Sequence, residues 1–291
     1  MGFAELIQQL ANGLVSGSVY ILVALGLTLI FGILQIPHFA HGSVAMLGGY
    51  TSFLSIQFLG IGPFLSLIIS MPIAALIGIG IERFLYRPVR DAPLINSFII
   101  ALGLLMVIDN SAEIVFGERQ VVLQSKHTDV WTLGPVTLTS LRVYIVVACV
   151  VLVGALLYLV HRTKLGSAIR ATAQNRDAAA MVGVNVNRVS STVFAVGSAL
   201  AAAAGAFIGA LFSISPHMGE VLMLKGFAVM ILGGMGSILG AVVGGATIGI
   251  LESFGGALIS SAYRDVWGFL AMILVLTLKP SGLFGSQELE H

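Results

Sequence analysis

Long hydrophobic stretches recur along this chain, and short polar connections separate them. A helix that spans a membrane needs about 20 mostly apolar residues. The apolar stretches lie at residues 10–34, 40–59, 64–86, 94–116, 142–160, 189–212 and 265–279, with a longer glycine-rich stretch at 222–255. This pattern predicts an all-α polytopic membrane protein with about eight transmembrane helices and with broken or re-entrant segments.

The composition supports a membrane protein over a soluble, nucleic-acid-binding or disulfide-bonded protein. Hydrophobic residues make up 57% of the 291 residues and charged residues only 9%, whereas soluble domains carry about 25% charged residues. The formal net charge of +1 gives no indication of nucleic-acid binding. Because Cys149 is the only cysteine, an intrachain disulfide is excluded.

We expect a single transmembrane domain over residues 1–285, followed by a partly vector-derived tail at 286–291 that ends in Leu-Glu-His. Residues 1–9 contain no lysine or arginine, so they do not resemble the basic start of a cleavable signal peptide.

Basic residues are concentrated in two connections. Arg83, Arg87 and Arg90 lie around the end of the third stretch. The loop 162–190 contains Arg162, Lys164, Arg170, Arg176 and Arg188. Positive charge marks cytoplasmic loops, and two spans separate the two connections, so both are predicted on the cytoplasmic side. The loop 117–141 is then expected on the outer face.

The glycine-rich stretch 222–255 is predicted to break. If Lys279 marks a cytoplasmic C-terminus, this stretch must leave and return on one side of the membrane. The break is expected in "GGMGS" (233–237). Irregular backbone at membrane depth is tolerated only where it is buried in protein or lines a wet cavity. Gly233, Gly234 and Gly236 are therefore candidate residues of a translocation path.

"QIPHFAHGSVAMLGGY" (35–50) places a proline and two histidines between two apolar stretches. Pro37 and Gly42 make a continuous helix doubtful here. A metal site would lack a nearby cysteine or acid, and a proton relay would need an acid from another span. The acids available on other spans are Asp109, Glu113 and Glu252. We favour a helix break in which His41 hydrogen-bonds backbone groups that the break leaves free.

Discontinuous helices flank the solute path in many transporters. Phe39, His41 and Gly42 are therefore expected to form part of the path wall rather than to bind a ligand, and no metal site is predicted.

Other polar residues interrupt the apolar stretches. Intramembrane acids are functional candidates by default, but Asp109, Asn110 and Glu113 lie near the outer end of their span. We expect them to reach the lipid headgroups. Lys225 and Glu252 lie near opposite ends of the glycine-rich stretch and would meet as an ion pair if it folds back.

Glycines four residues apart recur along the chain. The pairs are Gly13/Gly17, Gly205/Gly209, Gly236/Gly240, Gly240/Gly244 and Gly245/Gly249. Such pairs let helix backbones approach closely. We favour packing within one chain over a dimer face.

The loop 162–190 is predicted to contain a short helix. Asn175 is a good N-cap, Asp177 falls in the first turn, and Gly183 suits the position after the C-cap. Its small apolar residues are Ala178, Ala179, Met181 and Val182. The helix is suited either to contact another protein or to lie on the lipid surface.

Several motifs, in order along essentially the whole chain, resemble those of permeases of branched-chain amino-acid ABC importers. They are GLTLIFGI (26–33), HFAHG (38–42), ERFLYRPVR (82–90), AIRATAQN (168–175) with AAAMVGV (178–184), LKGFAVMILGGMGSILGAVVGG (224–245) and KPSGLFG (279–285). Two positions depart from the family pattern: His38 replaces the usual Asn, and Gln174 stands where Glu is common.

The resemblance implies the ABC importer permease fold in a bacterial inner (cytoplasmic) membrane and a transport subunit rather than an enzyme. The implied partners are a second, paralogous permease subunit, two cytoplasmic ATPases, a periplasmic solute-binding protein and membrane lipid. The ATPase-coupling residues would be Arg170, Gln174, Asn175, Asp177, Ala179 and Gly183.

The residues agree that this chain does not hydrolyse ATP. No lysine follows a glycine, so the chain lacks the GxxxxGK[ST] loop. No cofactor is expected in this chain, because ATP and Mg²⁺ would bind the partner ATPases.

Branched-chain or other hydrophobic amino acids are the expected solutes, with urea or short amides as alternatives. A self-sufficient secondary transporter is less favoured, because no convincing repeat relates the two halves. An intramembrane enzyme is least favoured.

Overall fold

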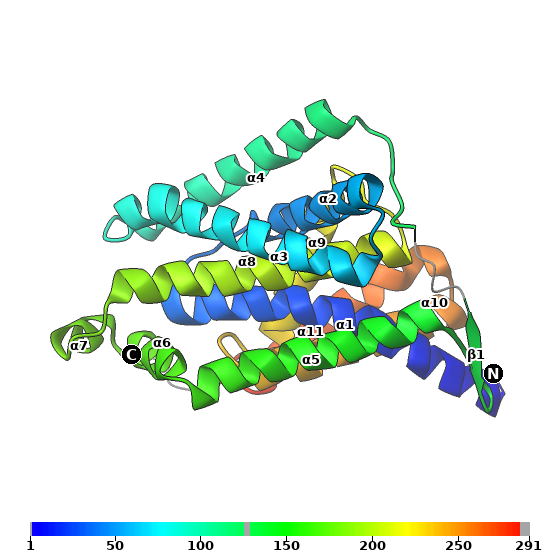
Figure 1. The fold of residues 1–291 in the computed structure, drawn as a ribbon. Helices are drawn as coiled ribbons and strands as arrows, with labels where there is room; N and C mark the ends of the chain where they lie inside the picture. The colour runs from blue at the N-terminus through cyan, green and yellow to red at the C-terminus, as the bar shows by residue number, and fades with distance from the viewer. Residues whose placement is uncertain (1, 125–128, 286–291) are drawn as a thin grey trace.

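The computed structural model describes residues 2–124 and 129–285, and its helices run largely alongside one another (Figure 1). Within these ranges six helical segments are long and apolar enough to cross a membrane. They are α1 (Phe3–Leu34), α3 with its short continuations (Pro63–Val89), α4 (Leu94–Phe116), α5 (Ser140–Arg162), α8 (Val186–Leu211) and α10 (Ile238–Leu258). The chain is thus an all-α polytopic membrane protein, as the hydrophobic pattern predicts. The tail 286–291 lies outside the described residues.

The remaining helices are shorter or less apolar. In the bundle these are α2 (His41–Leu59), α9 (Met218–Gly233) and α11 (Arg264–Leu278). Two helices, α6 (Lys164–Gln174) and α7 (Arg176–Met181), fill the predicted cytoplasmic loop, and α3 (Pro63–Ile81) continues through a π-helical turn (Glu82–Tyr86) and a 3₁₀ turn (Arg87–Val89). A further 3₁₀ turn (Ser261–Tyr263) precedes α11.

The connection between α4 and α5 contains a small antiparallel hairpin, a structure that the hydrophobic pattern does not predict. Strands β1 (Val130–Leu133) and β2 (Val136–Thr139) pair with Trp131 opposite Leu138. Gln8 near the start of α1 bonds this hairpin, because its Nε2 donates to the Thr137 carbonyl at 3.0 Å and its Oε1 accepts from the Thr137 N–H at 2.8 Å.

The bundle therefore has two distinct ends. The hairpin end holds β1, β2 and the start of α1 (Figure 1). The arginine-rich end holds α6, α7 and the turn after α3, where Arg90 Nη1 donates to Asn187 Oδ1 at 2.8 Å. The two arginine-containing connections thus lie at one end, as the charge pattern predicts.

Helix α1 forms the centre of the bundle and packs most closely against α10. A Cβ added at Gly13 would lie 2.6 Å from the Ile250 Cα, and one at Gly17 would lie 2.8 Å from the Gly245 carbonyl oxygen. Glycine is required at these crossings because the two backbones touch directly. The glycine pairs of α1 and α10 therefore serve packing within the chain.

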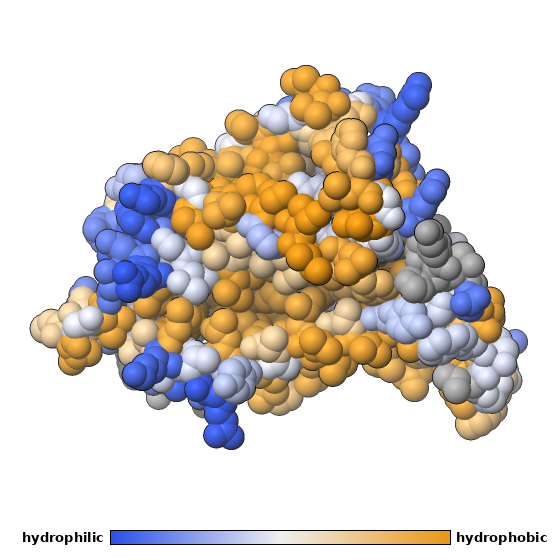
Figure 2. Space-filling view, viewed as in Figure 1, coloured by the Kyte–Doolittle hydropathy of each residue, from blue (hydrophilic) through white to orange (hydrophobic). Residues whose placement is uncertain are grey.

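The surface is apolar across the middle of the bundle. Figure 2 shows hydrophobic residues over the central part of one face, with hydrophilic residues gathered toward both ends. Helices α4 and α5 contribute strongly, since Ile114 and Val150 are 85% and 66% exposed. Such faces suit lipid or another apolar helix.

Candidate translocation and coupling sites

The chain leaves helical structure between α1 and α2. Gln35 has a left-handed conformation (φ 52°) after the end of α1, and α2 begins only at His41. His41 packs against Gly26 of α1, where an added Cβ would lie 2.5 Å from its Nε2. Gly26 precedes the end of α1 by about 12 Å at 1.5 Å per residue. Residues 35–40 thus turn back into the bundle, and α2 starts inside it.

The two histidines of this segment are buried among helices. His38 Nδ1 lies 2.9 Å from the Tyr86 hydroxyl, and its ring packs against Phe194. Among the described residues, neither ring nitrogen of His41 has a partner within hydrogen-bond geometry, and the backbone group that acts on the ring is that of Val23, in the middle of α1. The expectation that His41 hydrogen-bonds backbone groups left free by the break is therefore wrong, because its ring faces Gly26 and Val23 within α1.

Phe39 and Gly42 occupy different surroundings. Phe39 is half-buried, stacks on Phe227 of α9 and meets Phe98 of α4 edge-on, with both centroid distances 5.1 Å. Gly42 is buried against α9, where an added Cβ would overlap the Gly219 carbonyl oxygen. Of the three residues predicted to form the path wall, Phe39 is partly accessible, while His41 and Gly42 are buried against α1 and α9.

The second break separates α9 from α10, as the sequence predicts. Gly234 and Gly236 have positive φ angles of 101° and 83°, and Ser237 caps α10 by accepting from the Gly240 N–H at 3.0 Å. The break lies at the arginine-rich end, because an added Cβ on Gly32 near the end of α1 would be 2.8 Å from the Gly236 Cα.

Residues after α11 cover this turn. Leu283 donates its N–H to the Leu232 carbonyl, and Phe284 donates to the Gly233 carbonyl, both at 2.9 Å. Gly233, Gly234 and Gly236 therefore form a tightly packed turn at one end of the bundle, rather than irregular backbone in its middle.

Lys225 and Glu252 meet, as predicted for a stretch that folds back. Lys225 Nζ lies 2.6 Å from Glu252 Oε1 and 2.8 Å from Asp265 Oδ1. Tyr20 Oη donates to Glu252 Oε2 at 2.8 Å, and Arg264 Nε lies 3.7 Å from the same oxygen. This charge cluster, whose buried members are Tyr20, Lys225 and Glu252 and whose more exposed members are Arg264 and Asp265, joins α1, α9, α10 and α11.

Sequence reasoning found only the pair at the centre of this cluster. Arg264 and Asp265 are adjacent charged residues at the start of a short apolar stretch. Charged residues at such a position are candidates for an intramembrane ion pair, so this pattern could have identified both as members of the cluster. Tyr20 lies in a continuous apolar run and carries no such signal.

The polar residues near the end of α4 do not all face lipid headgroups. Asp109 is only 4% exposed, and within residues 2–124 and 129–285 its carboxylate oxygens have no partner at hydrogen-bond geometry; the Ser43 hydroxyl of α2 lies near them. Stacking of Tyr50 on Phe116, with centroids 3.9 Å apart, holds this part of α4 against α2. The headgroup expectation is wrong for Asp109. Glu113 is partly exposed and lies 3.8 Å from His217 Nε2.

A second buried carboxylate organises the arginine-rich end. Glu82 is 1% exposed and accepts from Arg87 at 2.5 Å, Arg90 at 2.8 Å and the Ser191 hydroxyl at 2.8 Å. This arrangement fixes the turn after α3 onto α8. Sequence reasoning used the arginines only to assign a membrane side and did not identify Glu82.

The loop 162–190 has the predicted local structure. Asn175 Oδ1 accepts from the Ala178 N–H at 2.9 Å and so caps α7, Asp177 lies in the first turn, and Gly183 has φ 89° after the helix. Met181 and Val182 are 81% and 80% exposed. Figure 1 shows α7 at the extremity of the bundle, so it presents an apolar surface beyond the packed helices.

Two predicted coupling residues face the protein itself. Ala179 is buried, and its carbonyl accepts from the Val184 N–H at 3.0 Å. Arg170 donates to the Val160 carbonyl at the end of α5. Ala179 is thus the buried one, whereas Arg170, Gln174, Asn175 and Asp177 are exposed.

Comparisons with known proteins agree with this architecture. A family model described as "Branched-chain amino acid transport system / permease component" matches residues 9–277. The high-affinity branched-chain amino acid transport system permease protein LivH of Escherichia coli (strain K12) is 34% identical over 99% of this chain and 98% of its own length. The corresponding protein BraD of Pseudomonas aeruginosa is 32% identical over 98% of this chain and 97% of its own. No solved structure matches.

These relatives are named as transport proteins, and this chain is a transport subunit and not an enzyme. The match extends across both breaks, the charge cluster and the loop 162–190. The chain therefore belongs to the permease family of branched-chain amino acid transport systems.

Proposed function

We propose that this chain is the membrane-spanning subunit of an ATP-driven importer that translocates branched-chain or other hydrophobic amino acids. The near full-length similarity to LivH and BraD supports the solute class. The single structural observation that carries the coupling to ATP is α7, whose exposed Met181 and Val182 form an apolar surface at the arginine-rich end.

The arginine-rich end faces the cytoplasm and the hairpin end faces the periplasm, in a bacterial inner membrane. The positive-inside rule supports this orientation. In this arrangement α7 contacts a cytoplasmic ATPase, and ATP and Mg²⁺ bind there and not to this chain. Two ATPases serve two permease subunits, the second being a paralogue. A periplasmic binding protein delivers the solute to the hairpin end.

The solute passes Phe39 on its way to the cytoplasm. Phe39 is half-buried and contacts α4 and α9 together, and a cavity of about 340 Å³ lies nearby at the arginine-rich end. Its lining includes Gln35, Ser97 and Gln174. His41 and Gly42 support the wall by packing against α1 and α9, and the 233–236 turn supports it by fixing the ends of α9 and α10.

The assembly is tested by gentle extraction of the tagged chain from its native membrane, followed by mass spectrometry of the co-purifying proteins. We expect two ATPases, a paralogous permease and a periplasmic binding protein. Recovery of the chain alone, or only with copies of itself, would contradict the proposal.

A further inference from the structure

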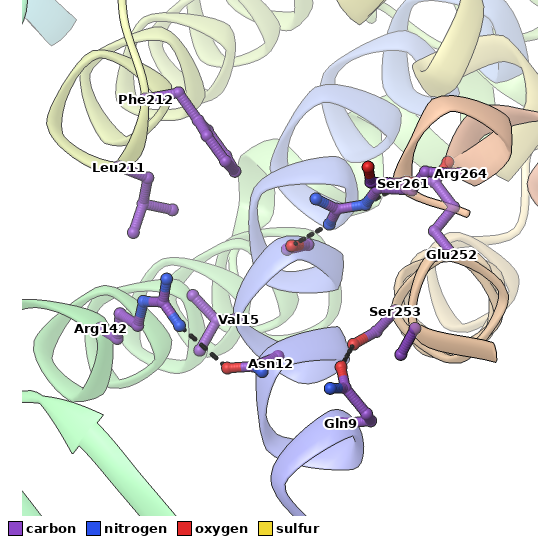
Figure 3. A pocket seen from close by; sticks show the side chains of 13 residues that line it. Gln9, Asn12, Val15, Arg142, Leu211, Phe212, Glu252, Ser253, Ser261 and Arg264 are labelled. Atoms are coloured by element: carbon purple, nitrogen blue, oxygen red, sulfur yellow. Dashed lines mark hydrogen bonds and ion pairs between the residues drawn. The ribbon is translucent and has the colours of Figure 1, made fainter. Parts of the chain in front are cut away.

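A second cavity, at the hairpin end, is lined by polar groups that the proposed path does not use. Its volume of about 310 Å³ is within the size range of small-molecule sites. The cavity lies between α1, α5 and α10, next to the end of α8 and the start of α11. Figure 3 shows Arg142 on one side and Arg264 on the other, with Asn12 and Gln9 of α1 between them.

The polar atoms left available in this cavity are mainly donors. Arg142 Nη1 donates to Asn12 Oδ1 at 2.9 Å, and Gln9 Oε1 accepts from the Ser253 hydroxyl at 2.8 Å (Figure 3). Both amide oxygens therefore already have partners. Arg264 Nη2 donates to the Ser16 hydroxyl at 2.8 Å, and its buried Nε lies 3.7 Å from Glu252 Oε2.

The charge balance of the lining favours an anion. Arg142 and Arg264 are positive, and Glu252 is the only acid in the lining. Lys225 and Asp265, which pair at 2.8 Å outside the lining, cancel each other's charge, so the lining keeps one net positive charge. Guanidinium groups present planar donor pairs that match a carboxylate. The lining also contains the apolar side chains of Val15, Leu211 and Phe212.

We propose that this cavity binds the carboxylate of an amphipathic carboxylic acid between Arg142 and Arg264, with the alkyl group against Phe212 and its apolar neighbours. The assignment rests on the proposed function, since it makes the cavity a site where a hydrophobic amino acid is held at the hairpin end. It also explains why the polar side chains of this cavity face an open space within an apolar bundle, where an unpaired polar group destabilises the fold.

The test measures binding of radiolabelled leucine to the full-length chain in lipid nanodiscs. We expect unlabelled leucine and 4-methylpentanoate to compete, and leucinamide and sulfate to compete poorly. Arg142→Gln should weaken leucine binding about tenfold or more, because a charge-assisted hydrogen bond is lost. Arg119→Gln is the matched control, because it removes an exposed arginine from the connection after α4 and should change nothing.

Arg264→Gln is less decisive, because Arg264 also contacts Ser16 and Glu252. Phe212→Ala removes only an exposed apolar ring of the lining and should weaken the binding of leucine more than the binding of acetate. Equal competition by leucinamide or sulfate, equal binding by the Arg142→Gln and Arg119→Gln variants, or no leucine binding at millimolar concentration would overturn the proposal.

Uptake by the assembled importer separates this proposal from the proposed function. If ATP-driven leucine uptake occurs with an unchanged dependence on leucine concentration in Arg142→Gln, the cavity assignment fails while the importer function stands. If the assembled wild-type complex takes up no amino acid, the importer function itself fails.

Discussion

Lys225 Nζ lies 2.6 Å from Glu252 Oε1, and this ion pair joins the two helices on either side of the 234–237 break. Glu252 also accepts from Tyr20, and Lys225 also bonds Asp265. Buried charges destabilise a fold unless they are paired and hydrogen-bonded. The cluster therefore fixes the folded-back stretch to α1 and α11.

Removing either partner of this pair should destabilise the protein. Lys225→Ala and Glu252→Ala should each cost about 3 kcal/mol, or roughly 6–12 °C in Tm, because each leaves a buried charge with fewer partners. The double variant should lose about as much as one single variant. Thermal unfolding in detergent measures this, with Lys164→Ala as the exposed control. Strictly additive losses would contradict a direct interaction.

Gly42 should tolerate no side chain. An added Cβ would overlap the Gly219 carbonyl oxygen, so Gly42→Ala must separate α2 from α9. We expect a cost of about 3 kcal/mol, at the upper end of typical overpacking. Gly154→Ala in α5 is the control, because nothing lies within 4 Å of its added Cβ. Similar melting temperatures of the two variants would show that the α2–α9 contact is loose.

The His38–Tyr86 contact should contribute measurably to stability. Tyr86→Phe removes a buried hydroxyl 2.9 Å from His38 Nδ1 and should cost about 1–2 kcal/mol. Tyr158→Phe, at a position that is 66% exposed, should have no effect. Comparison of the two unfolding midpoints checks the prediction, which fails if both variants melt like the wild type.

The α7 surface should be needed for association with the ATPase. Met181→Asp places a charge on an 81% exposed apolar side chain and should abolish co-purification of the ATPase subunits. Ser167→Asp adds the same charge to an exposed position of α6 and should leave association intact. Loss of the ATPase from neither variant, or from both equally, would place the ATPase contact elsewhere.

Local sequence signals predicted the features that depend on neighbouring residues. Asn175 and Gly183 fix the ends of α7 through capping and a left-handed turn, and both act within a few residues of their own position. The glycine and proline content likewise located both helix breaks. These interactions need no knowledge of the tertiary fold.

Features that depend on contacts between distant segments were missed or misjudged. Asp109 is near the end of a span by sequence but buried by α2, which begins inside the bundle. His41 was assigned backbone hydrogen bonds, although Gly26, fifteen positions earlier, makes room for its ring. Glu82 pairs with Ser191, which is 109 residues away. No local pattern encodes such partners.

Uptake of radiolabelled leucine into proteoliposomes tests the importer function most directly. The liposomes would contain this chain, its paralogue and the ATPases, with the binding protein outside and ATP inside. We expect accumulation that requires ATP hydrolysis and stops with Met181→Asp. Equal leucine uptake by this chain alone, without ATP or partners, would contradict the importer function and identify a self-sufficient carrier.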